Sequence, residues 1–125
     1  MATEHKNFGE FFKHCRLRAN KGLREFCVEN GLDPGNISKI EHGMLPPPQS
    51  HEKLAEYANA LELREGSDDW YELFDRAAAD KGIIPKDLLN DEELLARLPL
   101  VFRTMRNKRP DMNTLDRLIE FLRKA

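Results

Sequence analysis

The feature that most constrains the fold is a helix stop followed directly by a helix start, in the stretch NGLDPGNISKIEHG at residues 30–43. Gly31 is the residue type that ends a helix at positive φ, Asp33 is a good N-cap, and Pro34 suits the first helical position because its missing N–H would be unpaired there. The stretch therefore predicts two helices joined by a sharp turn. They are LREFCVEN, which follows Gly22, and PGNISKIEH, which Gly43 closes.

Helix signals recur along the rest of the first two thirds of the chain. A helix is expected over about Asn7 to Ala19, where aromatic residues repeat at helical spacing. Ser50 is a suitable N-cap for HEKLAEYANAL, and DDWYELFDRAAAD follows Ser67. No run of alternating apolar and polar residues indicates a strand, so the sequence predicts an all-α protein.

Two or three further helices are expected after KGIIPKDLL. One helix or a broken pair covers Asp91 to about Arg106, with Pro99 kinking or restarting it, and another runs from about Thr114 to Lys124. Asn90 with Glu93 resembles a capping box, and Asn113 is a candidate cap for the last helix. We expect two domains, 1–82 and a helical extension at 83–125.

The composition fits a small globular protein, with 40% apolar and 34% charged residues. No apolar run is long enough to span a membrane, and the start MATEHKNFGEF lacks the features of a secretory signal, so we expect a cytoplasmic protein with no membrane partner. Cys15 and Cys27 are expected to be small buried apolar residues rather than a redox pair.

Charge is segregated along the chain although the net charge is only -2. Residues 13–43 carry a net +2, residues 62–93 a net -7, and the segment from Arg97 to the end a net +5. A DNA duplex responds to the face presented to it, so this pattern is compatible with a DNA-binding face and an acidic far side. The basic run RTMRNKR is expected to face the acidic region rather than DNA.

No catalytic or metal site is indicated. The four histidines, His5, His14, His42 and His51, lack the spacing and partners of a metal site, and we expect no metal. No nucleophile triad or phosphate-binding glycine loop occurs, so we expect no cofactor and no enzyme activity.

The pattern LREFC....G.....ISKIEHG, over about Phe8 to Gly82, resembles the Xre type of helix-turn-helix found in phage repressors and many bacterial regulators. The resemblance depends on Phe26, Ile37 and Ile40 as core positions, on the turn glycine, and on Glu41 with Gly43. It implies a five-helix, lambda-repressor-like DNA-binding domain followed by the helical extension. A generic helical bundle is the alternative, because helical hairpins are common.

The resemblance also implies roles for individual residues. Its third helix would lie in the major groove, with base contacts from Gly35, Asn36 and Lys39. Contacts to the DNA backbone would come from residues around the second and third helices: Arg18, Lys21, Leu23, Arg24, Ser38 and His42. Arg16 and Glu41 correspond to a buried ion pair of relatives.

Two positions depart from the family pattern. Gly35 has no side chain with which to bind a base, so direct readout would rest mainly on Asn36 with adenine and Lys39 with guanine. Leu23 stands where many relatives carry a glutamine that binds a phosphate. We expect modest direct specificity for each subunit, supplemented by half-site spacing and DNA shape.

The C-terminal extension carries two amphipathic faces that a five-helix domain does not need. They consist of Leu94, Leu98, Val101, Phe102 and Met105, and of Leu115, Leu118, Ile119 and Leu122. They either extend the core of the same subunit, with Leu17 as a docking point, or form a homodimer interface. Because palindromic DNA reading requires a two-fold partner, we favour the homodimer.

The sequence therefore favours a sequence-specific transcriptional regulator, a repressor that binds an inverted repeat of double-stranded DNA as a homodimer. One alternative is an antitoxin that regulates its own operon and binds a toxin protein. Another is a protein-interaction module that has lost DNA binding, which Pro34 and Gly35 at the helix tip suggest. We expect no small-molecule effector, since the extension is too short for an ordinary ligand-binding domain.

Overall fold

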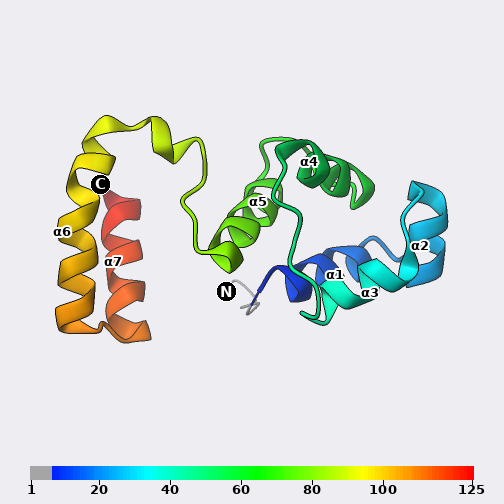
Figure 1. Cartoon of the computed structure of the whole chain (residues 1–125), viewed down its shortest axis with the longest axis horizontal. Coiled ribbons are helices and arrows are strands. Elements are labelled where there is room, and N and C mark those ends of the chain that lie inside the picture. The colour runs from blue at the N-terminus through cyan, green and yellow to red at the C-terminus, as the bar shows by residue number, and fades with distance from the viewer. Residues whose placement is uncertain (1–6) are drawn as a thin grey trace. The chain divides into compact units, whose positions relative to one another are not determined.

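The computed structural model describes residues 7–125, and the regular segments of this range are all helical, which confirms the all-α class. The chain divides into two compact units, Met1–Pro85 and Lys86–Ala125. The first unit holds α1 (Phe8–Arg18), α2 (Leu23–Asn30), α3 (Pro34–Glu41), α4 (His51–Ala60) and α5 (Asp68–Lys81) (Figure 1). The second holds the short 3-10 helix η1 (Leu88–Asn90), α6 (Glu92–Lys108) and α7 (Met112–Lys124).

The predicted caps Gly31, Asp33 and Ser50 are confirmed, and Asn7, expected as the first residue of a helix, caps α1 instead. The side chains of Asn7, Asp33, Ser50 and Ser67 each accept a hydrogen bond from a backbone N–H in the first turn of the helix that follows. Gly31 ends α2 in the left-handed conformation, at φ 65°. These local signals define the helices because they satisfy backbone groups that a helix end leaves without intrahelical partners.

The core of the first unit centres on Phe12. Its ring centroid lies 5.9 Å from that of Phe8, 5.8 Å from that of Phe26 and 5.4 Å from that of Tyr57, so Phe12 joins α1, α2 and α4. Such aromatic pairs contribute about 0.5–1.5 kcal/mol beyond their buried area. The contacts explain why three helices with short apolar faces form one core.

Both cysteines are free and buried in this core, as the sequence predicted. Burial raises the pKa of the Cys15 thiol to about 11, since the thiolate would lose its hydration, and burial also raises the pKa of Cys27. The thiols therefore stay protonated near neutral pH and act as small apolar groups.

Helix α1 packs against α3 and α5, and Figure 1 shows α1 beside α3. Gly9 permits the close approach to α3, because a Cβ at this position would lie 2.3 Å from the carbonyl oxygen of Ile40 and 2.7 Å from that of Glu41. At the same end of α1, the Phe8 N–H donates to the Asp80 carboxylate at 3.1 Å. The start of α1 is thus fixed to the end of α3 and to α5.

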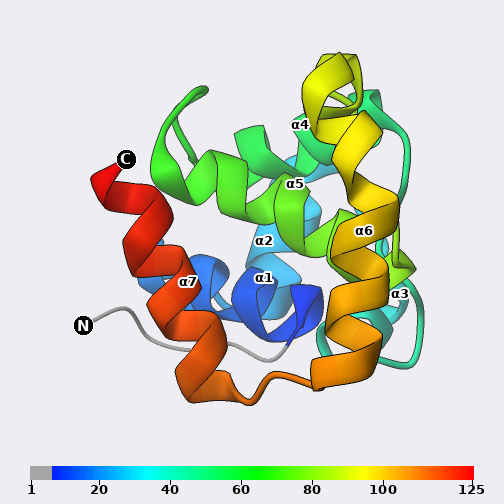
Figure 2. The same ribbon diagram turned by 90° about the vertical axis from the view of Figure 1, so that its left-hand side faces the viewer.

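The second unit is a helical hairpin with no fully buried residue. Helices α6 and α7 are joined by a short connection in which Arg109 adopts φ 44°, and Figure 2 shows the two helices diverging from it. Of the two expected alternatives, one helix or a broken pair, the structure has one helix, because α6 continues through Pro99 without a restart.

Both caps predicted for the extension are also wrong. Asp91, not Asn90, caps α6 by accepting from the Leu94 N–H, and Asn90 lies in η1. Asp111, not Asn113, caps α7 by accepting from the Thr114 N–H at 2.8 Å, so α7 begins at Met112 rather than near Thr114. This hydrogen bond lowers the pKa of Asp111, because it stabilises the carboxylate.

Within residues 7–125, no helix is both long and apolar enough to cross a bilayer.

The close approach at Gly9 gives a test of the packing. Gly9→Ala should lower the free energy of unfolding by at least about 1–3 kcal/mol, since the added methyl must displace backbone atoms of α3. Gly35→Ala is the matched control within a helix, because its Cβ would meet only the Asp33 side chain, at 3.2 Å. Urea unfolding measures both changes, and equal stability of the two variants would contradict the assigned contact.

Candidate nucleic-acid interface

The candidate interface is formed by α2, its turn and α3. After Gly31, the Leu32 N–H donates to the Cys27 carbonyl at 2.9 Å, which closes the end of α2. Asp33 then accepts from the Asn36 N–H at 2.9 Å and starts α3. Helices α2 and α3 contact each other, and Phe26 and Ile37 are both buried in the shared core. The turn is therefore a fixed corner rather than a loose linker.

Helix α3 has one buried face and one exposed polar face. Ile37, Ile40 and Glu41 are buried. Gly35, Asn36, Lys39 and His42, which the resemblance assigned to DNA contacts, are all exposed. Ser38 is half-buried, and its carbonyl oxygen lies 2.8 Å from His42 Nδ1. The exposed residues are available to a partner, whereas Ser38 and His42 also help to end the helix.

A buried ion pair anchors α3 to α1. Arg16 Nε lies 2.7 Å from one carboxylate oxygen of Glu41, and Arg16 Nη2 lies 2.9 Å from the other. The side chains are only 6% and 2% exposed. Arg16 Nη1 also donates to the Lys21 carbonyl at 2.9 Å, and the hydrogen bond with Glu41 raises the pKa of Arg16. The pair implied by the resemblance is thus present, and it orients α3.

The start of α2 offers backbone donors and one cation. Gly22 is its N-cap and has no side chain that could accept a hydrogen bond from the first turn. Backbone N–H groups at a helix N-terminus suit an anion such as a phosphate. Arg24 is exposed beside them, but the Leu23 side chain packs against the core, so Leu23 can contribute only through its backbone.

Arg18 and Lys21 are held by acidic side chains. Arg18 Nη2 lies 2.6 Å from an Asp69 oxygen in α5, and Lys21 Nζ lies 2.8 Å from a Glu29 oxygen and 3.4 Å from a Glu62 oxygen. These contacts draw both cations away from the role of free phosphate ligands. No local sequence pattern indicates the Arg18–Asp69 pair, because its members are far apart in the chain.

Sequence reasoning also missed Gly9, which determines how closely α1 approaches the end of α3. The signal was present as a glycine inside an aromatic helical stripe, where alanine would otherwise favour the helix by about 1 kcal/mol. A glycine in such a position indicates close backbone packing.

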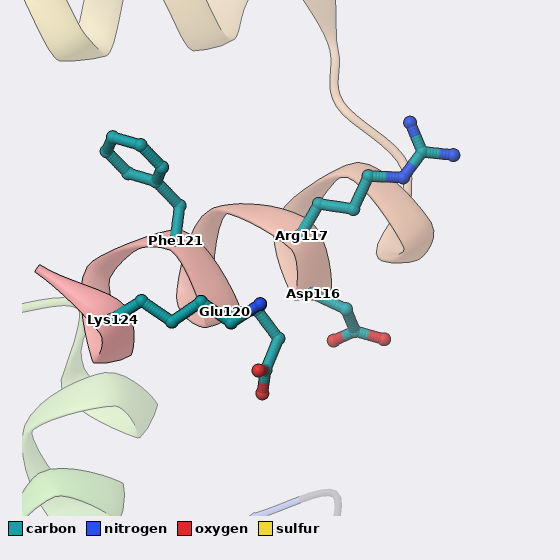
Figure 3. Close-up of a pocket in the computed structure, with 5 residues that line it drawn as sticks. All are labelled: Asp116, Arg117, Glu120, Phe121 and Lys124. Atoms are coloured by element: carbon teal, nitrogen blue, oxygen red, sulfur yellow. The ribbon is translucent and has the colours of Figure 1, made fainter.

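Two open depressions lie on helices outside this interface. Figure 3 shows a depression on α7 lined by Asp116, Arg117, Glu120, Phe121 and Lys124, which project in different directions from this one helix. A second open depression lies on α5 and is lined by Asp68, Tyr71, Glu72, Asp75, Arg76 and Ala79. Among residues 7–125, no group of His, Cys, Asp or Glu is arranged to hold a metal; His5 lies outside the described residues.

The ion pair predicts the behaviour of single and paired substitutions. Arg16→Ala leaves the Glu41 carboxylate buried without its partner, so stability should fall by about 3–5 kcal/mol and the melting temperature by about 10 °C or more. The double variant Arg16→Met with Glu41→Leu should lose much less, since no buried charge remains. Thermal melts measure both, and an unchanged melting temperature for Arg16→Ala would refute the anchoring role.

Comparisons of the chain with protein-family profiles, with characterised proteins and with solved structures find no match.

Proposed function

We propose that the protein is a sequence-specific DNA-binding regulator whose first unit has the Xre-like helix-turn-helix arrangement. The observation that carries the proposal is the exposed polar face of α3, a short helix whose other face is fixed to α1 and α2. A helix held in this way can enter a major groove without losing its own packing. The motif resemblance in residues 23–43 points to the same function.

The exposed face has few groups that can read bases. The Asn36 amide can pair with both edge atoms of adenine, and Lys39 can donate to the guanine acceptors. Gly35 has no side chain, which permits close approach of the α3 backbone to the groove wall but adds no base-specific hydrogen bond. Each subunit therefore reads a short half-site, and an inverted repeat bound by a homodimer supplies the rest of the specificity.

The charges around α3 also indicate that one subunit alone would bind DNA weakly. Between Gly22 and Gly43 the exposed cations are Arg24 and Lys39, while Glu25, Glu29 and Asp33 are exposed acids. Few phosphates are thus neutralised by each subunit, so binding outside the operator should be weak and the salt dependence shallow. Occupation of an operator that overlaps a promoter would make the protein a repressor.

Substitutions on the reading face test the proposal. Asn36→Ala and Lys39→Ala should each weaken binding to the best site by about 1–3 kcal/mol and relax preference at one base position. Arg24→Ala should weaken all sequences alike and reduce the salt slope by about 1 for each subunit. Fluorescence anisotropy with operator and scrambled duplexes measures these effects.

Arg64→Ala is the matched control for loss of positive charge, because Arg64 is exposed in the connection between α4 and α5. Its operator affinity should stay close to that of the parent. If Asn36→Ala and Lys39→Ala also bind like the parent, α3 is not the reading helix.

An antitoxin is the second candidate function, and the depression on α5 favours it. Three acids and the half-exposed Tyr71 surround this open surface, a chemistry that suits a basic toxin protein. The same helix-turn-helix would then regulate the operon. A small basic reading frame beside the gene, whose toxicity this protein suppresses on co-expression, would support the antitoxin over a regulator without a protein partner.

A further inference from the structure

The second unit leaves most of its apolar side chains uncovered. Leu94, Leu98 and Leu115 are half-buried, while the other large apolar residues of α6 and α7 are exposed. The exposed ones are Leu95, Leu100, Val101, Phe102, Met105, Met112, Leu118, Ile119, Phe121 and Leu122. The largest apolar patch of an ordinary monomer covers roughly 300–600 Å².

The exposed area suits a stable interface. Phe102 and Leu118 are 51% and 52% exposed, and Val101, Met105, Ile119 and Leu122 are exposed to a similar degree. Side chains of this size, half accessible along two helices, together supply an area of the order of the roughly 800 Å² that each partner contributes to a standard interface. The apolar stripes of α6 and α7 therefore provide enough surface for a partner of the same size.

The charges of α6 indicate which partner fits. Asp91, Glu92 and Glu93 mark its N-terminal end, and Arg106, Lys108 and Arg109 mark its C-terminal end. None of these six side chains forms an ion pair with another residue in the range 7–125. A second α6 in antiparallel orientation would bring each acidic end to a basic end, whereas a parallel one would bring like charges together.

We propose that the second unit associates with the same unit of another copy of this chain, with the two α6 helices antiparallel across a two-fold axis. The stripe of Leu98, Val101, Phe102 and Met105 forms the centre, and the charged ends of α6 fix the orientation. Helix α7 contributes Leu118, Ile119 and Leu122 to the same interface. This deepens the proposed function, which requires a two-fold dimer.

Charge reversal in the full chain tests the orientation without DNA. Sedimentation velocity at micromolar concentration should show a dimer for the parent. Glu92→Lys with Glu93→Lys should raise the dissociation constant about tenfold or more, and so should Arg106→Glu with Lys108→Glu. The fourfold variant, which exchanges both ends, should regain the parent affinity. A parallel dimer would be insensitive to each single-end reversal, and that result would overturn the proposal.

Apolar substitutions locate the interface. Phe102→Ser should give a monomer. Phe121→Ser is the control and should leave the dimer intact, because Phe121 is 71% exposed and lies outside the stripe of Leu115, Leu118 and Leu122. Melting of the first unit, followed by Trp70 fluorescence, should be unchanged by both. A parent chain that sediments as a monomer, or dimers that survive Phe102→Ser and every charge reversal, would refute the interface. A dimer that binds no DNA would refute only the DNA function.

Discussion

The attachment of α3 to α1 depends on the buried pair of Arg16 and Glu41. Two hydrogen-bonded contacts of 2.7 and 2.9 Å connect the guanidinium to the carboxylate, and a third bond reaches the Lys21 carbonyl before α2 begins. The Arg16 side chain therefore connects α1 to α3 and to the turn that precedes α2. Removal of one partner alone would leave a buried charge and weaken the attachment of α3 to α1.

Three of the cations near α2 and α3 are paired with acidic side chains of the same subunit. Glu41 pairs with Arg16, and Asp69 pairs with Arg18. Lys21 contacts both Glu29 and Glu62. Because their charges are paired, these cations add little to the electrostatic potential of the exposed face of α3. In the proposed function, the DNA affinity of one subunit rests on a few groups around α3, and the proposed homodimer adds a second set of these groups. The apolar hairpin of the second unit offers the means for such pairing.

Much of the first unit could be predicted from the sequence, because its helix ends are encoded locally. Asp33, Ser50 and Ser67 each cap the helix that follows, and Gly31 and Gly82 end helices at positive φ. In the extension, several polar residues compete for each cap, and Asp91 and Asp111 displaced the predicted Asn90 and Asn113. The contact between Arg18 and Asp69 depends on the packed fold and leaves no local pattern. Gly9 does leave one, a glycine within an aromatic helical stripe, but this pattern does not identify the α3 backbone as its neighbour.

The most direct test of the central claim, that α3 reads DNA, is selection of bound fragments from a random duplex pool by the full chain. We expect an inverted repeat whose half-sites lie about one helical turn apart and each contain a preferred adenine and a preferred guanine. Pools selected by Asn36→Ala should no longer prefer the adenine, and pools selected by Lys39→Ala should no longer prefer the guanine. A pool that shows no enriched sequence at low salt, or enrichment identical for the parent and both variants, would contradict the account.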